Sequence, residues 1–169
     1  MVWRKWIAAL IITFVPSVFA SELNCWVVTL SDGDTFTCLD VIKKQYRIRL
    51  ANIDTSEKNQ PYGTKDKQIL SSLIFNKLVL IEMHVFDRYG QVIGITYIDG
   101  INVNREMVAR GAAWIYPQYN RFQSLPTLEN KAKSAGLGIL ASDQAPVIPL
   151  WEWWKSGNHS SSEFSERKT

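Results

Sequence analysis

Glycine, proline and cysteine are all scarce in this chain of 169 residues, which contains 9, 6 and 2 of them respectively. These low counts exclude a collagen-like repeat, a disordered low-complexity chain and a small disulfide scaffold for the body of the sequence. A hydrophobic fraction of 46% is close to the globular average, and the length suffices for one domain with its own core but not for two. We therefore expect one soluble domain.

Long hydrophobic runs are also missing. A membrane-spanning helix needs ~20 apolar residues, whereas the apolar run near the start extends only from Trp6 to Phe14 and is followed by Pro16. Residues 1–20 combine this run with a short basic start and a small-residue cleavage site ending at Ala20, which is typical of a secretory signal peptide. An uncleaved membrane anchor is the alternative. We predict cleavage after Ala20, export to the periplasm or the medium, and a mature monomer without stable membrane association.

The net charge is small as well. It is +3 for the whole chain, and removal of a leader containing Arg4 and Lys5 takes nineteen basic residues to seventeen against sixteen acidic ones, or +1. Long-range attraction at such a low charge does not suffice to hold a nucleic acid. Any binding of phosphates must therefore come from a local cluster of basic side chains.

Both cysteines, Cys25 and Cys38, lie close to a tight turn sequence at residues 31–34, about which their positions are symmetric. Cysteines on paired strands of an exported protein can form a disulfide, because compartments outside the cytosol are oxidising. Two buried free thiols are the alternative. Export and symmetry together favour the disulfide.

The hydrophobic pattern predicts five strands and three helices. Residues 26–50 alternate or run apolar with β-branched and aromatic side chains, and two turn signals, Asp32-Gly33 and Lys43-Lys44-Gln45, divide them into three strands. Further strands are expected at 78–86 and 92–98, and helices at 61–76, 103–110 and 124–134. This order predicts an α+β fold, a five-stranded OB-like β-barrel with three helices, over residues 21–155. The Ser-rich residues 156–169 are expected to form a disordered polar tail.

Several polar residues near the predicted turns have the chemistry of a phosphodiesterase site. Asp34 and Asp54 are hard oxygen ligands of the kind that a calcium ion needs. Glu57 follows closely enough to orient or deprotonate an attacking water, and the planar fork of Arg49 suits two phosphate oxygens. Taken singly, each residue has an ordinary alternative: Asp34 as a turn former, Arg49 and Glu57 as a surface ion pair, and Tyr116 as a core residue.

The ordered set of motifs resembles the staphylococcal nuclease family. The resemblance rests on DGDTF, RLANIDTSE, QPYG, DRYG, DG-x-NVN, ARGAAWIY and a late PLWEW, and it covers residues 25–155. It implies a calcium-dependent endonuclease that hydrolyses phosphodiester bonds of DNA and RNA with low sequence specificity. By this resemblance Asp34, Asp54 and the carbonyl of Thr55 would bind Ca²⁺, Glu57 would act on the water, Arg49 would clamp the phosphate, and Tyr89 and Tyr116 would lie beside the nucleotide.

One catalytic position departs from the family pattern. The family has an arginine after the Tyr-Gly of DRYG, where this chain has Gln91. In the family that arginine stabilises the charge developing on the phosphoryl group and assists the leaving oxygen, whereas an amide brings no positive charge. An arginine in this role in phosphoryl transfer is worth ~10³–10⁵ in rate.

Two hypotheses follow from Gln91. The chain is an active nuclease in which another arginine, Arg47, Arg88 or Arg110, substitutes for the missing one, or it is a catalytically impaired nucleic-acid-binding module of the same fold. Strand alternation places Arg47 on the same face as Arg49, two residues away, which makes Arg47 a candidate second phosphate clamp and substrate-binding residue.

Overall fold

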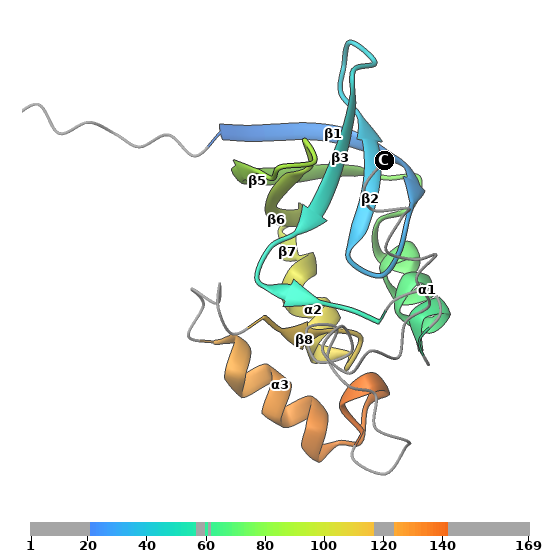
Figure 1. The fold of residues 1–169 in the computed structure, drawn as a ribbon, viewed down its shortest axis with the longest axis vertical. Helices are drawn as coiled ribbons and strands as arrows, with labels where there is room; N and C mark the ends of the chain where they lie inside the picture. Colours follow the sequence, from blue (N-terminus) through green and yellow to red (C-terminus); the bar gives the residue numbers. More distant parts are fainter. Residues whose placement is uncertain (1–20, 57–59, 61, 117–123, 142–169) are drawn as a thin grey trace, which may run out of the picture.

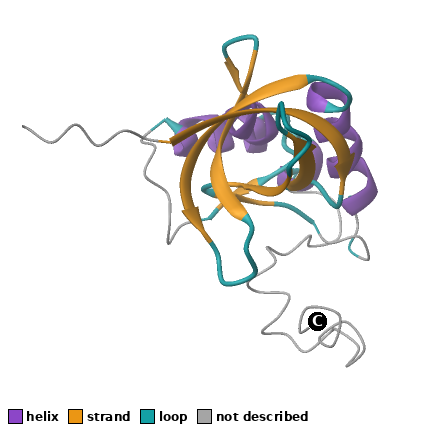
Figure 2. Ribbon diagram, turned by 90° about the horizontal axis from the view of Figure 1, so that it is seen from above, coloured by secondary structure: helices purple, strands orange, loops and turns teal. Residues whose placement is uncertain are grey.

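The computed structural model describes residues 21–56, 60, 62–116 and 124–141. Five long strands form one sheet: β1 (Ser21–Leu30), β2 (Thr35–Leu39), β3 (Gln45–Leu50), β5 (Leu78–Phe86) and β6 (Val92–Ile98). The strand order is β3-β2-β1-β5-β6, with the two-residue strand β7 (Ile101–Asn102) paired to β6 at the end of the sheet, and the parallel pairing of β3 with β6 closes the five long strands into a barrel. Figure 2 looks toward the ring of strands and shows the helices outside it. The predicted five-stranded barrel is confirmed.

Within the described residues three helices accompany the barrel, as the sequence predicts. They are α1 (Gly63–Ile74), α2 (Val103–Ala109) and α3 (Leu125–Ser134), and a short 3-10 turn, η2 (Gly138–Leu140), follows α3 (Figure 1). Among the described residues no helix is both long and apolar enough to cross a membrane. The predicted leader, the polar tail and Pro61, where the first helix was expected to begin, lie outside the described residues.

The structure differs from the expected boundaries in two respects. Strand β1 begins at Ser21, five residues before the expected start, because its first half pairs with β5 from Ser21 opposite Met83 onward. Three two-residue strands were not expected: β4 (Ile53–Asp54), β7 (Ile101–Asn102) and β8 (Trp114–Ile115). Strands this short leave no periodicity in the sequence, and only their pairing partners define them.

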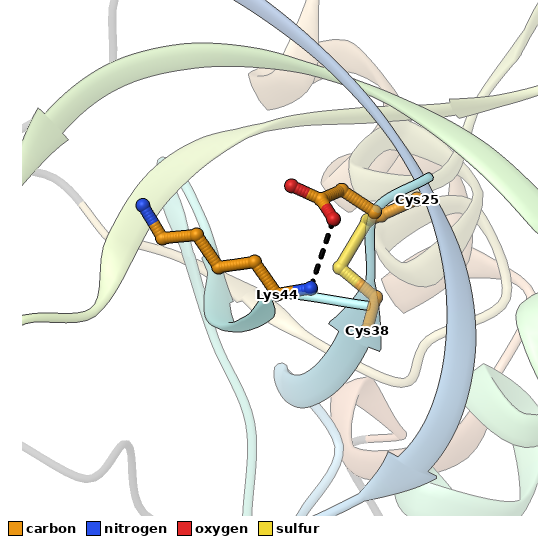
Figure 3. The surroundings of a disulfide bond; sticks show 4 residues. Cys25, Cys38 and Lys44 are labelled. Carbon is orange, nitrogen blue, oxygen red and sulfur yellow. Dashed lines mark hydrogen bonds between the residues drawn. A yellow bond between two sulfur atoms is a disulfide. The ribbon is translucent and has the colours of Figure 1, made fainter. Parts of the chain in front are cut away.

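The disulfide between Cys25 and Cys38 joins β1 to β2, with the two Cα atoms 5.5 Å apart (Figure 3). Cys38 lies opposite Val27 rather than opposite Cys25, two residues from the partner that symmetry about the turn predicts. Residues two apart on a strand point to the same face, so Cys25 is the diagonal neighbour of Cys38. The predicted bond is therefore present, in a different register.

The buried amide of Asn104 stabilises the seam of the barrel, where β3 pairs with β6. Asn104, on α2, donates from Nδ2 to the carbonyl oxygens of Ala51 (2.9 Å) and Gly94 (3.3 Å), and its Oδ1 accepts from the Thr96 N–H (3.0 Å). Asn104 is 2% exposed, so these bonds satisfy backbone groups that water cannot reach. They fix the end of β3 against β6, and the residues that follow β3 carry the candidate site.

Candidate active site

Asp34 lies in the turn between β1 and β2 and is held from several sides. Its N–H donates to Asp32 Oδ1 (3.1 Å), its Oδ1 accepts from the Thr35 hydroxyl (2.8 Å), and its carbonyl oxygen accepts from the Leu50 N–H (2.9 Å). The residue is only 3% exposed. The DGDT sequence therefore builds a turn that fixes one carboxylate in place.

Arg49 connects this carboxylate to a second one. Its Nη2 lies 3.1 Å from Asp34 Oδ2 and 2.8 Å from Asp54 Oδ1, and its Nη1 donates to Asp34 Oδ1 at 3.2 Å. Asp54 comes from β4, which pairs antiparallel with β8. The structure thus brings the predicted residues Asp34, Arg49 and Asp54 together from a turn and two strands.

The two carboxylates carry more negative charge than one arginine neutralises. Burial raises the pKa of Asp34 well above its usual value and the negative charges of Asp32 and Asp54 raise it further, whereas the Arg49 guanidinium lowers it. The pKa of Arg49 is in turn raised, first by the charge of Asp34. A buried pair of carboxylates with surplus negative charge favours a bound cation.

The donor set fits calcium, which takes oxygen ligands from carboxylates, main-chain carbonyls and water. Within the described residues no group of three or more His, Cys, Asp and Glu gathers, so Asp34 and Asp54 would need other oxygens to complete the coordination. The carbonyl of Thr55 is the predicted third ligand, and Thr55 directly follows Asp54 in a buried segment. Glu57 lies outside the described residues.

Gly33 is required by close packing rather than by the turn itself. A Cβ placed on Gly33 would lie 2.8 Å from Thr55 Oγ1 and 2.9 Å from the Cβ of Asp66. Its φ is not positive, unlike that of Gly90 in the hairpin between β5 and β6. The turn between β1 and β2 therefore packs directly on the segment that carries Asp54 and Thr55.

Asp66 contacts the segment that carries Asp54 and Thr55 through a hydrogen bond with Ser56, and it was not predicted from the sequence. It lies on α1, is 1% exposed and accepts from the Ser56 N–H at 3.3 Å. Burial raises its pKa from 3.8 to about 7. The signal was present, because Asp66 occupies the position one helical turn before Leu70 and two before Ile74, on the buried face of α1.

The hairpin between β5 and β6 presents Tyr89 and Gln91. Asp87 Oδ1 accepts from the N–H groups of both residues at 2.8 Å, which holds the turn rigidly. Tyr89 is 59% exposed, and the guanidinium of Arg88 lies 4.8 Å from the centre of its ring. An exposed ring of this kind has the properties of a stacking platform for a base.

The side chain of Gln91 lies between Asp87 and Arg47. Parallel pairing of Ile48 with Val92 places the preceding residues, Arg47 and Gln91, side by side. When the amide is oriented so that both of its ends are satisfied, its oxygen accepts from Arg47 Nε (3.0 Å) and its nitrogen donates to Asp87 Oδ2 (3.2 Å). The other two arginines considered as substitutes are placed differently: Arg88 lies over Tyr89, and Arg110 pairs with Glu106 at 3.1 Å.

Tyr116 follows β8, and the β4–β8 pairing brings its backbone next to Asn52. Its N–H donates to the carbonyl oxygen of Asn52 at 2.9 Å, and its side chain is half-buried. Trp114, by contrast, is a core residue that packs with Ala132, Ile139 and Leu140. The pairing thus carries a tyrosine from far along the chain to the segment that contains Asp54.

Comparison with known proteins gives consistent matches. The family described as "Staphylococcal nuclease homologue" matches residues 47–142. An uncharacterized endonuclease of Escherichia coli is 42% identical over 151 residues, or 89% of this chain and 97% of the relative. One of Haemophilus influenzae is 38% identical over 140 residues, or 83% of this chain and 78% of the relative. Staphylococcal-like nuclease CAN1 of Arabidopsis thaliana is 35% identical over 117 residues, or 69% of this chain and 36% of the plant protein.

Proposed function

The chain belongs to the staphylococcal nuclease family, and we propose that it is an exported, calcium-dependent endonuclease that hydrolyses phosphodiester bonds of DNA and RNA with low sequence specificity. The observation that carries the proposal is the convergence of Asp34 and Asp54 on one guanidinium, that of Arg49. A buried carboxylate pair beside an arginine fork offers a cation site next to a phosphate site.

Asp34, Asp54 and the carbonyl of Thr55 would hold the calcium ion. When bound, the ion supplies positive charge that polarises a phosphoryl oxygen of the substrate. Arg49 is 30% exposed at its side chain, so its fork is accessible to a substrate phosphate from the solvent side. Its contact with the phosphate would stabilise the charge that develops there during attack.

Three further residues complete the proposed reaction. Glu57 orients or deprotonates the attacking water, as in the family this chain belongs to. The exposed ring of Tyr89 and the half-buried Tyr116 lie beside the nucleotide, where their rings stack on a base and their hydroxyls reach phosphate. Stacking accepts any base, which accounts for low sequence specificity.

A second candidate function is a nucleic-acid-binding module with impaired catalysis. The observation that favours it is Gln91, because an amide adds no positive charge where the family has an arginine. The retained Asp34, Arg49, Asp54 and Glu57 favour the enzyme, since binding alone does not need a general base beside a cation site.

Digestion of plasmid DNA and of RNA by the purified mature protein separates the two functions. The nuclease should cleave both in calcium and neither in a chelator, and Glu57→Gln should lose cleavage while still binding nucleic acid. Binding without cleavage at saturating calcium would establish the module instead. The intact mass of the exported chain, expected to begin at Ser21, tests the proposed leader.

A further inference from the structure

We propose that Arg47 supplies the second positive charge of the phosphate site and that Gln91 is the residue that positions it. The inference rests on the proposed nuclease function. Gln91 brings no positive charge, and Arg47 lies beside it on the paired strand β3. The proposal assigns the missing charge to Arg47.

The sheet register places Arg47 on the correct face. Arg47 lies opposite Thr37 and Arg49 opposite Thr35 on β2, so the two arginines point to the same side of β3. Arg49 already contacts both site carboxylates. A substrate phosphate bound at Arg49 would therefore lie close to Arg47, which is the next side chain on the same face of β3.

The hydrogen bonds of Gln91 orient the Arg47 guanidinium. The amide oxygen accepts from Nε, which leaves the terminal nitrogens of Arg47 to other partners. The amide nitrogen donates to Asp87, whose other carboxylate oxygen accepts the two N–H groups of its own turn. Asp87 is thus fixed by the hairpin, Gln91 by Asp87, and Arg47 by Gln91. An arginine at position 91 could not accept this bond, because a guanidinium has only donors.

Arg47 also differs from Arg49 and Arg110 in its charge balance. Arg49 pairs with Asp34 and Asp54, and Arg110 pairs with Glu106. Among the described residues no carboxylate forms an ion pair with Arg47, which is exposed. Its contact with Gln91 is to a neutral amide, so its positive charge remains available to a phosphate.

The test is single-turnover cleavage of a short labelled single-stranded DNA in calcium. Arg47→Ala should lower the rate ~10²-fold or more, as removal of a stabilising donor from developing charge does. Arg105→Ala, which removes an exposed arginine from α2, should stay within about twofold of the parent. The exchange Arg47→Gln with Gln91→Arg returns the charge to the family position and should recover much of what Arg47→Ala loses. Arg47→Lys keeps the charge without Nε and should fall between the parent and Arg47→Ala.

A second measurement separates charge from orientation. Binding of the same DNA is followed against salt in a Glu57→Gln background, in which we expect no cleavage. Arg47→Ala should reduce the slope of log K against log salt by ~0.7, the value for one lost phosphate contact on a single strand. Gln91→Ala keeps the charge, so it should leave this slope unchanged while slowing cleavage ~10-fold in the active background. A purely structural role of Gln91 would not give that split.

The outcomes distinguish this inference from the proposed function. If the parent cleaves and Arg47→Ala cleaves as fast as Arg105→Ala, Arg47 has no such role although the chain is a nuclease. If the parent does not cleave at all, the proposed nuclease is wrong and the salt slope decides alone: a fall with Arg47→Ala supports the phosphate contact, and an unchanged slope overturns it.

Discussion

Replacing Asp66 by asparagine should change how the stability of the fold depends on pH. The carboxyl lies under the segment that carries Asp54 and Thr55, and burial raises its pKa from 3.8 to about 7. Between these two values the folded chain keeps the proton on Asp66 while the unfolded chain has lost it. The folded state then binds more protons, so the free energy of unfolding falls as pH rises from about 4 to about 7 and levels off above that.

The size of the effect follows from the same two pKa values. Each pH unit in the window removes up to about 1.4 kcal/mol of stability, and a span of about three units gives a full loss of about 4 kcal/mol. In Asp66→Asn the amide oxygen can still accept from the Ser56 N–H, and the group does not ionise. The variant should therefore lose this part of the pH dependence. Above pH 7 it should be more stable than the parent, because it avoids this loss. That gain in stability is smaller by ~1–3 kcal/mol if the buried amide N–H groups find no acceptor.

Urea unfolding at pH 5 and pH 8, in a chelator that keeps metal off the nearby carboxylates, measures this difference. Asp99→Asn is the matched control, since Asp99 is exposed in the turn between β6 and β7. The parent should lose stability relative to Asp66→Asn between the two pH values, and Asp99→Asn should follow the parent. Equal pH dependence of the parent and Asp66→Asn would mean that Asp66 is ionised in the fold throughout this range, which would refute the burial argument.

Three further predictions concern the site and its frame. Calcium should raise the melting temperature of the parent, and Asp54→Asn should abolish the rise; equally tight calcium binding by the variant would place the site elsewhere. Gly33→Ala should cost ~1–3 kcal/mol by overpacking against Thr55 and weaken calcium binding, whereas unchanged calcium affinity would contradict the expected effect of this packing on the calcium site. Alkylation of unfolded, unreduced protein should label no cysteine, and reduction should cost ~3 kcal/mol for a separation of 13 residues; two labelled thiols would exclude the disulfide.

The long strands could be predicted because their signals are local. The bounds expected for β5 and β6 are those observed, since alternating side chains on either side of a turn sequence leave a pattern that one sequence contains. The pairing of β4 with β8 could not be predicted in this way. It joins Asp54 to Trp114 across sixty residues, and two residues per strand carry no periodicity. The contact of the Tyr116 backbone with Asn52 extends the same pairing.

Non-local strand pairing also explains why the sequence alone left two hypotheses open, an active nuclease and an impaired binding module. Strand alternation places Arg47 and Arg49 on one face, which needs only β3 itself. The position of Gln91 depends on the parallel pairing of β3 with β6, two strands that β4, α1 and β5 separate in the chain. Along the sequence, Gln91 is a lost charge and Arg47 is one of several arginines. In the fold, the oriented amide of Gln91 accepts a hydrogen bond from Arg47. By our proposal, the replacement of the family's arginine by Gln91 therefore moves the positive charge to β3. The effect of the charge lost at position 91 has to be assessed together with Arg47, its neighbour on the paired strand.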